Sequence, residues 1–168
     1  MEVLEIERLY RMYFDTVYRI CFLYMKQEED ALDMVQETFE KLMRCKFHQQ
    51  SEEKTKAWLI VTASNCCKTH LAKWWRKKRE TFDEKVLEQQ AAEDNSRTRE
   101  IISAVMELEE KYRIATYLYY FEGFTTGEIG HMLHISPSTV QTRLAKARKI
   151  LKLELQETEI SVTNHVSC

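Results

Sequence analysis

Residues 136–152, SPSTVQTRLAKARKILK, combine five Lys or Arg side chains with hydroxyl and amide groups and contain no acid. Cations neutralise phosphates, whereas short hydroxyl and amide side chains can hydrogen-bond the edges of bases. A second acid-free segment, KTHLAKWWRKKR at residues 68–79, holds six cations beside two tryptophans. Aromatic rings stack on unpaired bases while nearby cations hold the backbone. The chemistry that these segments could perform is therefore the recognition of nucleic acid.

The overall charge of the chain confines that recognition to local patches. The 168 residues carry 25 Lys or Arg and 27 Asp or Glu, which gives a formal net charge of −2 and a sequence pI near 6.2. A protein of this charge does not coat nucleic acid through bulk electrostatics. Residues 1–40 hold ten acids against four cations, so the positive charge of the N-terminal half lies further along the chain.

Two successive helix starts position the first cationic segment. In FTTGEIGHML, Thr125 is placed to cap a helix and Glu128 follows three residues later, which is the pattern of a capping box. In ISPSTV, Ser136 is placed to cap a second helix and Pro137 takes its first position. Only about three residues, 134–136, separate the two helices. Short helices joined by so tight a turn form a helix-turn-helix.

Successive residues of an α-helix are rotated by 100°, and this rotation divides the second of these helices into two sides. Val140, Leu144, Ala147 and Leu151 share one side, which we expect to be buried. The opposite side and its flanks carry short polar groups and cations, which suit the major groove and the phosphates beside it. A solvated surface face is the alternative reading. The residues that we expect to contact DNA from this helix are Ser138, Thr139, Gln141, Thr142, Arg143, Lys146, Arg148 and Lys149.

The helix that carries the second cationic segment also divides into two sides. The same rotation places Trp58 in line with Asn65 and two cations, an arrangement that suits a platform for single-stranded DNA. Two structural readings stay open: Trp58 could pack on a neighbouring helix, and the cations could favour the helix dipole. The expected core side consists of Ile60, Ser64, Cys67, Leu71 and Trp74. The expected DNA-binding residues are Trp58, Thr62, Asn65, Lys68, Lys73 and Arg76.

The fold that these elements predict is all-α. Only three Gly and one Pro occur, all between residues 123 and 137, and the remaining stretches are poor in turn formers. Helical spacing of apolar residues predicts helices over about 3–25 and 29–45, with Leu32, Val35, Phe39 and Leu42 as the stripe of the second. We expect a helical domain over 1–80, a flexible linker over 81–99, a helix-turn-helix domain (winged-helix-like, tetrahelical) over 100–155 and a tail over 156–168.

Other functional classes find little support in the sequence. The start of the chain is too charged for a signal peptide, no apolar run reaches the length of a membrane span, and five cysteines without a disulfide-like pattern suggest a cytoplasmic protein. Cys66, Cys67 and His70 lack a fourth metal ligand. No phosphate loop, nucleophile elbow or paired carboxylates appear. We therefore expect no metal, cofactor, small-molecule substrate, catalytic residue or enzymatic activity.

Three stretches together resemble a known family, the extracytoplasmic-function sigma factors, which are the small two-region members of the bacterial sigma-70 family. DALDMVQETFEKL at 30–42 resembles its core-polymerase-binding stretch. KAWLIVTASNCCKTHLAKWWRKKR at 56–79 is similar to its promoter-melting helix, and LYYFEGFTTGEIGHMLHISPSTVQTRLAKARKIL at 118–151 to its upstream-element reader. The stretches occur in the family's order and cover nearly the whole chain apart from the linker and the last dozen residues.

The resemblance implies a subunit that binds bacterial core RNA polymerase and directs it to promoter DNA. The domain over 1–80 would correspond to sigma region 2 and the domain over 100–155 to sigma region 4. Trp58 and Asn65 would engage the minus-ten element as it opens, and the helix after Pro137 would read the minus-thirty-five element. Whether an anti-sigma factor binds the chain stays open. The residues that the resemblance assigns to polymerase binding are Asp33, Gln36, Glu37 and Phe39.

Three positions depart from the family's pattern. Thr69 stands where Asp is frequent and Gln141 where Lys or Arg is common, which leaves the promoter sequence open. Gly130 stands where Ala is usual. A glycine in a helix interior costs about 1 kcal/mol, which close helix packing could offset.

Two further hypotheses account for parts of the same pattern. A freestanding helix-turn-helix regulator would bind duplex operator DNA alone, with residues 1–79 serving for dimerisation or sensing. An interaction protein that docks on polymerase without reading DNA would be insensitive to charge reversal at Lys146 and Lys149. The order of the three stretches favours the promoter-specificity subunit over both.

Overall fold

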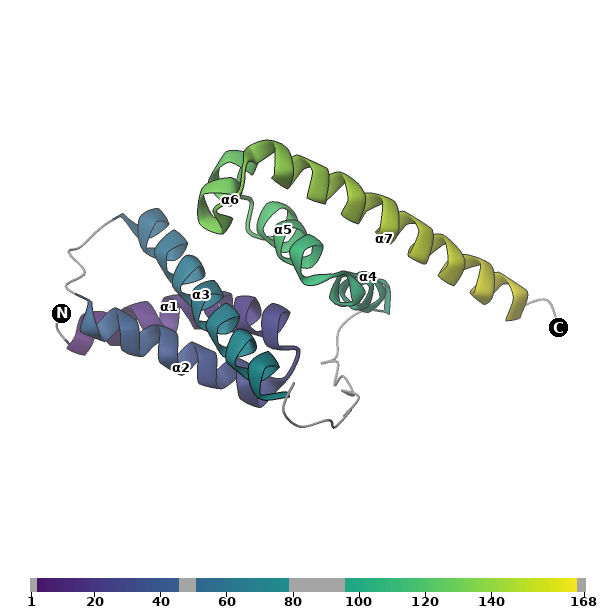
Figure 1. The fold of residues 1–168 in the computed structure, drawn as a ribbon. Coiled ribbons are helices and arrows are strands. Elements are labelled where there is room, and N and C mark those ends of the chain that lie inside the picture. Colours follow the sequence, from purple (N-terminus) through teal and green to yellow (C-terminus); the bar gives the residue numbers. More distant parts are fainter. Residues whose placement is uncertain (1–2, 46–50, 79–95, 166–168) are drawn as a thin grey trace. The chain divides into compact units, whose positions relative to one another are not determined.

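The computed structural model describes residues 3–45, 51–78 and 96–165, and all the regular structure in these ranges is helical (Figure 1). The chain divides into two compact units, one within residues 1–89 and the other within 90–168. The predicted all-α fold is confirmed for the described residues. None of their helices is both long enough and apolar enough to cross a membrane.

The first unit is a bundle of three helices, α1 (Val3–Met25), α2 (Glu28–Arg44) and α3 (Glu52–Lys78), each packed against the other two (Figure 1). Its core is aliphatic and aromatic and includes Leu42, Leu59 and Ile60. Tyr13 also donates a hydrogen bond from its hydroxyl to the carbonyl of Glu52 at 3.0 Å, which ties α1 to the start of α3. The apolar residues that recur at helical spacing along α1 are all buried: Leu9, Tyr13, Val17, Ile20 and Tyr24.

Two residues assigned to this core are exposed instead. Leu32 is 41% exposed, whereas Val35, Phe39 and Leu42 of the same predicted stripe are buried. Trp74 is 45% exposed, although it follows Ile60, Ser64 and Cys67 on the buried side of α3. Trp74 lies near the end of α3, where helical periodicity no longer implies that a neighbouring helix covers the residue. Leu32 lies in a turn of α2 whose residues Ala31 and Met34 are buried, so its exposure places it at the edge of the buried side of α2.

The second unit comprises α4 (Ser96–Glu107), α5 (Glu110–Tyr120), α6 (Thr126–Leu133) and α7 (Pro137–His165) (Figure 1). The helix α7 packs against the other three, and Leu118, Ile129 and Val140 are fully buried. Residues 96–99 of the expected linker are helical, as are residues 156–165 of the expected tail; residues 81–95 of that linker lie outside the described ranges.

A buried arginine joins α4 to α5. Arg113 is 4% exposed, and its guanidinium donates to the carbonyl oxygens of Met106 at 2.9 Å and Leu108 at 3.0 Å. These carbonyls lie at the C-terminal end of α4, where the last turn of a helix leaves its carbonyl groups without intrahelical donors. The cation also complements the negative end of the helix dipole. Arg113 therefore caps α4 from within the core.

The helix-turn-helix forms as its capping residues predict. Thr125 accepts a hydrogen bond from the backbone N–H of Glu128 at 3.2 Å, and the Glu128 carboxylate accepts one from the backbone N–H of Thr125 at 2.8 Å. The Thr125 hydroxyl also donates to this carboxylate at 2.9 Å, and the bonds from the Thr125 backbone N–H, the larger cause, and from its hydroxyl hold the pKa of Glu128 below its ordinary value. The turn begins at His134, in the left-handed conformation (φ 56°), and Ser136 Oγ caps α7 by accepting from the N–H of Thr139 at 3.2 Å.

Candidate nucleic-acid interface

The helix α7 presents the predicted polar face to solvent. Val140, Leu144 and Ala147 are buried and Leu151 is partly buried, so the apolar side of α7 faces the unit's core as expected. Thr139 and Arg143 lie at the edge of the packed side and are partly buried. The remaining predicted contact residues are exposed: Ser138, Gln141, Thr142, Lys146, Arg148 and Lys149.

Some of these exposed side chains also contact their own unit. Arg148 donates to the Tyr120 hydroxyl on α5 at 3.0 Å, and the Lys146 ammonium lies 5.8 Å from the centre of the Tyr112 ring. These contacts restrict both cations to the flanks of the exposed face, where DNA phosphates would lie. The Thr142 hydroxyl donates to the carbonyl of Ser138 at 3.0 Å. Its methyl group and the two lone pairs of its oxygen are what Thr142 offers to a base edge.

The predicted DNA face of α3 is exposed over most of its length. Asn65, Lys68, Lys73 and Arg76 are exposed, whereas Thr62 and Trp58 are partly buried. The buried residues Leu59, Ile60, Ala63, Ser64, Cys66 and Cys67 occupy the other side of the helix. Thr69 is exposed and shares the ring position of Asn65 to within about 40°. The helical register of Thr69 thus places it on the predicted DNA face as well.

The predicted polymerase-binding residues of α2 fall into two groups. Asp33 and Gln36 are exposed, and Glu37 is partly buried beside α3. Phe39, in contrast, is 4% exposed, and its ring packs 4.7 Å from that of Tyr10 on α1. A side chain buried between α1 and α2 cannot touch a partner's surface directly. The assignment of Phe39 as a contact residue therefore needs correction, because its place in the structure is the core beneath that surface.

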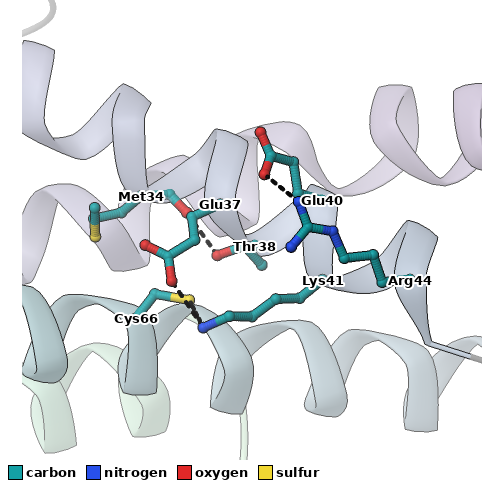
Figure 2. Close-up of polar contacts among 7 residues, drawn as sticks. All are labelled: Met34, Glu37, Thr38, Glu40, Lys41, Arg44 and Cys66. Atoms are coloured by element: carbon teal, nitrogen blue, oxygen red, sulfur yellow. Dashed lines mark hydrogen bonds and ion pairs between the residues drawn. The ribbon is translucent and has the colours of Figure 1, made fainter.

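A polar cluster joins α2 to α3 at Cys66 (Figure 2). The Lys41 ammonium lies 2.8 Å from a carboxylate oxygen of Glu37 and donates to Cys66 Sγ at 3.1 Å. The hydrogen bond from Lys41 lowers the pKa of Glu37, and the same pairing raises the pKa of Lys41. Burial raises the pKa of the Cys66 thiol. Because the Lys41 ammonium already donates to Cys66 Sγ, it also disfavours a metal ion at Cys66, Cys67 and His70.

Family models match both units. The model described as sigma-70 region 2 matches residues 9–81, and the model described as sigma-70, region 4 matches residues 98–151. Among curated relatives, the chain is 31% identical over 156 residues to the ECF RNA polymerase sigma factor SigM of Bacillus subtilis, covering 88% of this chain and 93% of that protein. It is 29% identical over 146 residues to the RNA polymerase sigma factor SigV of Bacillus subtilis, covering 86% and 87%.

The chain belongs to the extracytoplasmic-function sigma factors of the sigma-70 family. It is an alternative sigma subunit that directs transcription initiation, and the hypothesis of a freestanding regulator is not favoured, because the sigma-70 region 2 match accounts for the first unit. A solved structure of the sigma factor RpoE from Bartonella quintana has the same fold as this sigma factor, with a TM-score of 0.75 and 21% identity over 92% of this chain and 98% of that one.

Proposed function

We propose that the residues 1–80 of this sigma factor bind core polymerase through α2 and the minus-ten element through α3, and that residues 100–155 bind the minus-thirty-five element through α7. One observation supports this division of roles. Both α3 and α7 turn their apolar side into their own unit and leave an exposed side of cations and hydrogen-bonding groups.

The α3 face has the chemistry required by a promoter that is opening. An exposed amide at Asn65 can hydrogen-bond the edge of a base that has left the stack, and the partly exposed Trp58 can stack on a neighbouring base. Lys68, Lys73 and Arg76 contact the backbone around it. The Lys41–Cys66 contact lies one residue from Asn65 and helps to hold this part of α3 against α2.

The α7 face has the chemistry required by paired DNA. A helix placed with its N-terminal residues in the major groove brings Ser138, Gln141 and Thr142 to base edges. Lys149 lies on the same exposed side, and it contacts phosphates together with Arg148 and Lys146, which flank that side. The capping of α7 by Ser136 fixes where the helix begins and therefore which residues reach the groove first.

Polymerase binding falls to the exposed residues Asp33 and Gln36 together with the partly exposed Glu37. Acidic and amide groups suit contact with a protein surface, and the carboxylates of Asp33 and Glu37 repel DNA phosphates. Because Glu37 is already paired with Lys41, Asp33 is the stronger candidate for a new ion pair with polymerase. Phe39 supports this surface from below.

Two further parts of the proposal concern partners and location. One solved structure is a sigma factor in complex with the anti-sigma factor NepR, and we extend that kind of regulation to this chain. The chain has no catalytic residue of its own, since polymerase carries out the chemistry of transcription. Because core polymerase and promoter DNA lie in the cytoplasm, this sigma factor acts there.

The direct test is reconstitution with purified bacterial core polymerase. We expect the chain to be retained on immobilised core, and the resulting holoenzyme to give a run-off transcript from a promoter of the native host. Asp33→Lys should weaken retention on core, while Lys149→Ala, which changes only the proposed DNA face of α7, should leave retention intact. Absence of retention by the wild-type chain would refute the proposal.

A further inference from the structure

A carboxylate of α2 lies against the cationic helix α3. Between Lys54 and Lys78, α3 carries no acid of its own. The negative charge at this helix comes from Glu37, whose Oε1 lies 2.8 Å from the Lys41 ammonium, and that ammonium donates to Cys66 Sγ of α3 at 3.1 Å (Figure 2). Lys41 therefore ties the Glu37 carboxylate to α3.

The charge of Glu37 also acts on Lys73. Lys73 follows Cys66 by seven residues, which places it within about 20° of the same ring position, two turns further along α3. The hydrogen bond from Lys41 is the largest cause of the low pKa of Glu37, and the positive charge of Lys73 lowers that pKa further. Because the interaction of two charges is mutual, Glu37 offsets part of the positive charge that the exposed Lys73 presents.

The same carboxylate borders the proposed polymerase surface of α2. Glu37 is partly exposed and follows the exposed Asp33 by four residues, and side chains four residues apart are neighbours on a helix surface. A cationic group of polymerase that pairs with Asp33 would therefore lie close enough to Glu37 to offset its charge as well. Glu37 thus lies between a proposed contact with polymerase, at Asp33, and a proposed contact with the DNA backbone, at Lys73.

We propose that Glu37 couples these two contacts, so that binding of core polymerase at α2 strengthens the binding of α3 to single-stranded DNA. In the unbound subunit, Glu37 repels a phosphate that approaches Lys73. In holoenzyme, the positive charge that polymerase brings to α2 offsets Glu37, and Lys73 binds the phosphate more tightly. Such coupling is reciprocal, so DNA bound at Lys73 also strengthens the binding of core. This inference rests on the functions proposed for α2 and α3.

A matched pair of substitutions isolates the charge of Glu37. Glu37→Gln removes the charge and keeps the length and shape of the side chain. Glu40→Gln makes the same change on the same helix, where the carboxylate pairs with Arg44 at 3.5 Å and points away from Cys66 (Figure 2). Each variant removes one negative charge from α2, so a general gain in DNA affinity would appear in both.

The first measurement uses the full-length chain without polymerase. The probe is a fluorescein-labelled nontemplate strand of a promoter that the wild-type holoenzyme transcribes, and fluorescence anisotropy at low salt follows its binding. We expect Glu37→Gln to bind about threefold more tightly than the wild type, as for the removal of one nearby like charge at a hydrated surface. Glu40→Gln should gain much less. In a Lys73→Gln background, Glu37→Gln should have no effect, because the cation through which Glu37 acts is absent.

The second measurement repeats the titration with saturating core polymerase. Wild type and Glu37→Gln should then bind the single strand alike, because polymerase already offsets the carboxylate. The inference is overturned if the free Glu37→Gln chain binds like the wild type, if neither binds, or if Glu40→Gln gains as much. It is also overturned if the gain persists with Lys73→Gln or in holoenzyme.

A separate variant distinguishes failure of this inference from failure of the proposed function. Asn65→Ala changes the proposed base contact of α3 and leaves Glu37 and Lys73 in place. Should Asn65→Ala holoenzyme bind the single strand more weakly than the wild type although Glu37→Gln has no effect, the function proposed for α3 stands without the coupling. Should Asn65→Ala also bind like the wild type, that function fails as well.

Discussion

Gly130 and Ile135 meet across the turn of the helix-turn-helix so closely that no side chain fits between them. A methyl group on Gly130 would lie 2.7 Å from the carbonyl oxygen of Ile135 and 3.3 Å from the nitrogen of Pro137. The N–H of Ile135 also donates to the Gly130 carbonyl at 2.9 Å. The glycine thus lets α6 approach the backbone that leads into α7, and this close approach constrains the angle at which α7 leaves the turn.

We predict that Gly130→Ala destabilises the second unit. The atoms that the new methyl group meets belong to the backbone, which cannot move aside as a flexible side chain would. Overpacking of this kind typically costs about 1–3 kcal/mol, which outweighs the gain of about 1 kcal/mol in helix propensity. Urea unfolding of the full-length chain, followed by circular dichroism, measures the net effect.

Gly127→Ala is the matched control for that experiment. Gly127 lies in the same helix, and a methyl group there would meet only the Thr125 hydroxyl oxygen, at an ordinary 3.9 Å. The substitution should stabilise the unit or leave its stability unchanged. If both alanine variants stabilise the protein, the close approach at Gly130 does not constrain the turn.

Arg113 provides a second stability prediction. Arg113→Met keeps much of the side-chain bulk but leaves the carbonyls of Met106 and Leu108 without their donor in a buried site. An unsatisfied buried acceptor costs about 1–3 kcal/mol, so the free energy of unfolding should fall by about this amount. Lys111→Ala, on the exposed side of the same helix, should leave the free energy of unfolding nearly unchanged. Equal effects of the two substitutions would contradict the capping role of Arg113.

The capping box should make part of the stability depend on pH. The pKa of Glu128 is lower in the folded protein than in the unfolded chain, because the Thr125 backbone N–H and hydroxyl bond to its charged form. Its stabilisation is therefore complete above the unfolded-state pKa and is lost as the pH falls through the folded-state pKa. At neutral pH the wild type should be more stable than Glu128→Gln, and this difference should disappear as the pH is lowered. Thermal unfolding of both proteins at a series of pH values measures the difference. A difference in stability between the wild type and Glu128→Gln that does not change with pH would contradict this account.

Local signals in the sequence predicted much of this structure. The caps at Thr125 and Ser136 depend on residues within one helical turn, so sequence spacing was sufficient to find them. The same holds for the buried side of α7, which packs along several turns. The exposure of Leu32 and Trp74 could not be predicted in this way, because it depends on how much of each side of α2 and α3 the neighbouring helices cover.

Contacts between helices were the other part that the sequence did not reveal. The ammonium of Lys41 reaches Cys66 across 25 positions of sequence, and Arg113 turns a charged side chain into the core to cap another helix. Neither residue differs in type or spacing from an ordinary surface cation. The burial of Phe39 also shows that a residue in a recognised contact motif can act through packing rather than contact.

The exposed cations of α7, which we propose contact DNA, allow a prediction about salt dependence. Each phosphate contact that is lost should reduce the slope of log affinity against log salt by about 0.9. Because Lys149 is exposed on the DNA side of α7, Lys149→Ala should reduce the slope for holoenzyme on promoter duplex by about this amount. Lys111→Ala removes an exposed cation paired with Glu109 outside that face and should leave the slope unchanged. Filter binding at a series of salt concentrations will measure both slopes, and an unchanged slope for Lys149→Ala would remove that residue from the interface.

The most direct test of the central claim, that the exposed side of α3 reads the minus-ten element, is run-off transcription by Asn65→Ala holoenzyme on templates that differ at single minus-ten positions. We predict that the variant binds core polymerase like the wild type but loses discrimination among bases at one position of the element. If the variant ranks all templates as the wild type does, α3 does not read the minus-ten element through Asn65.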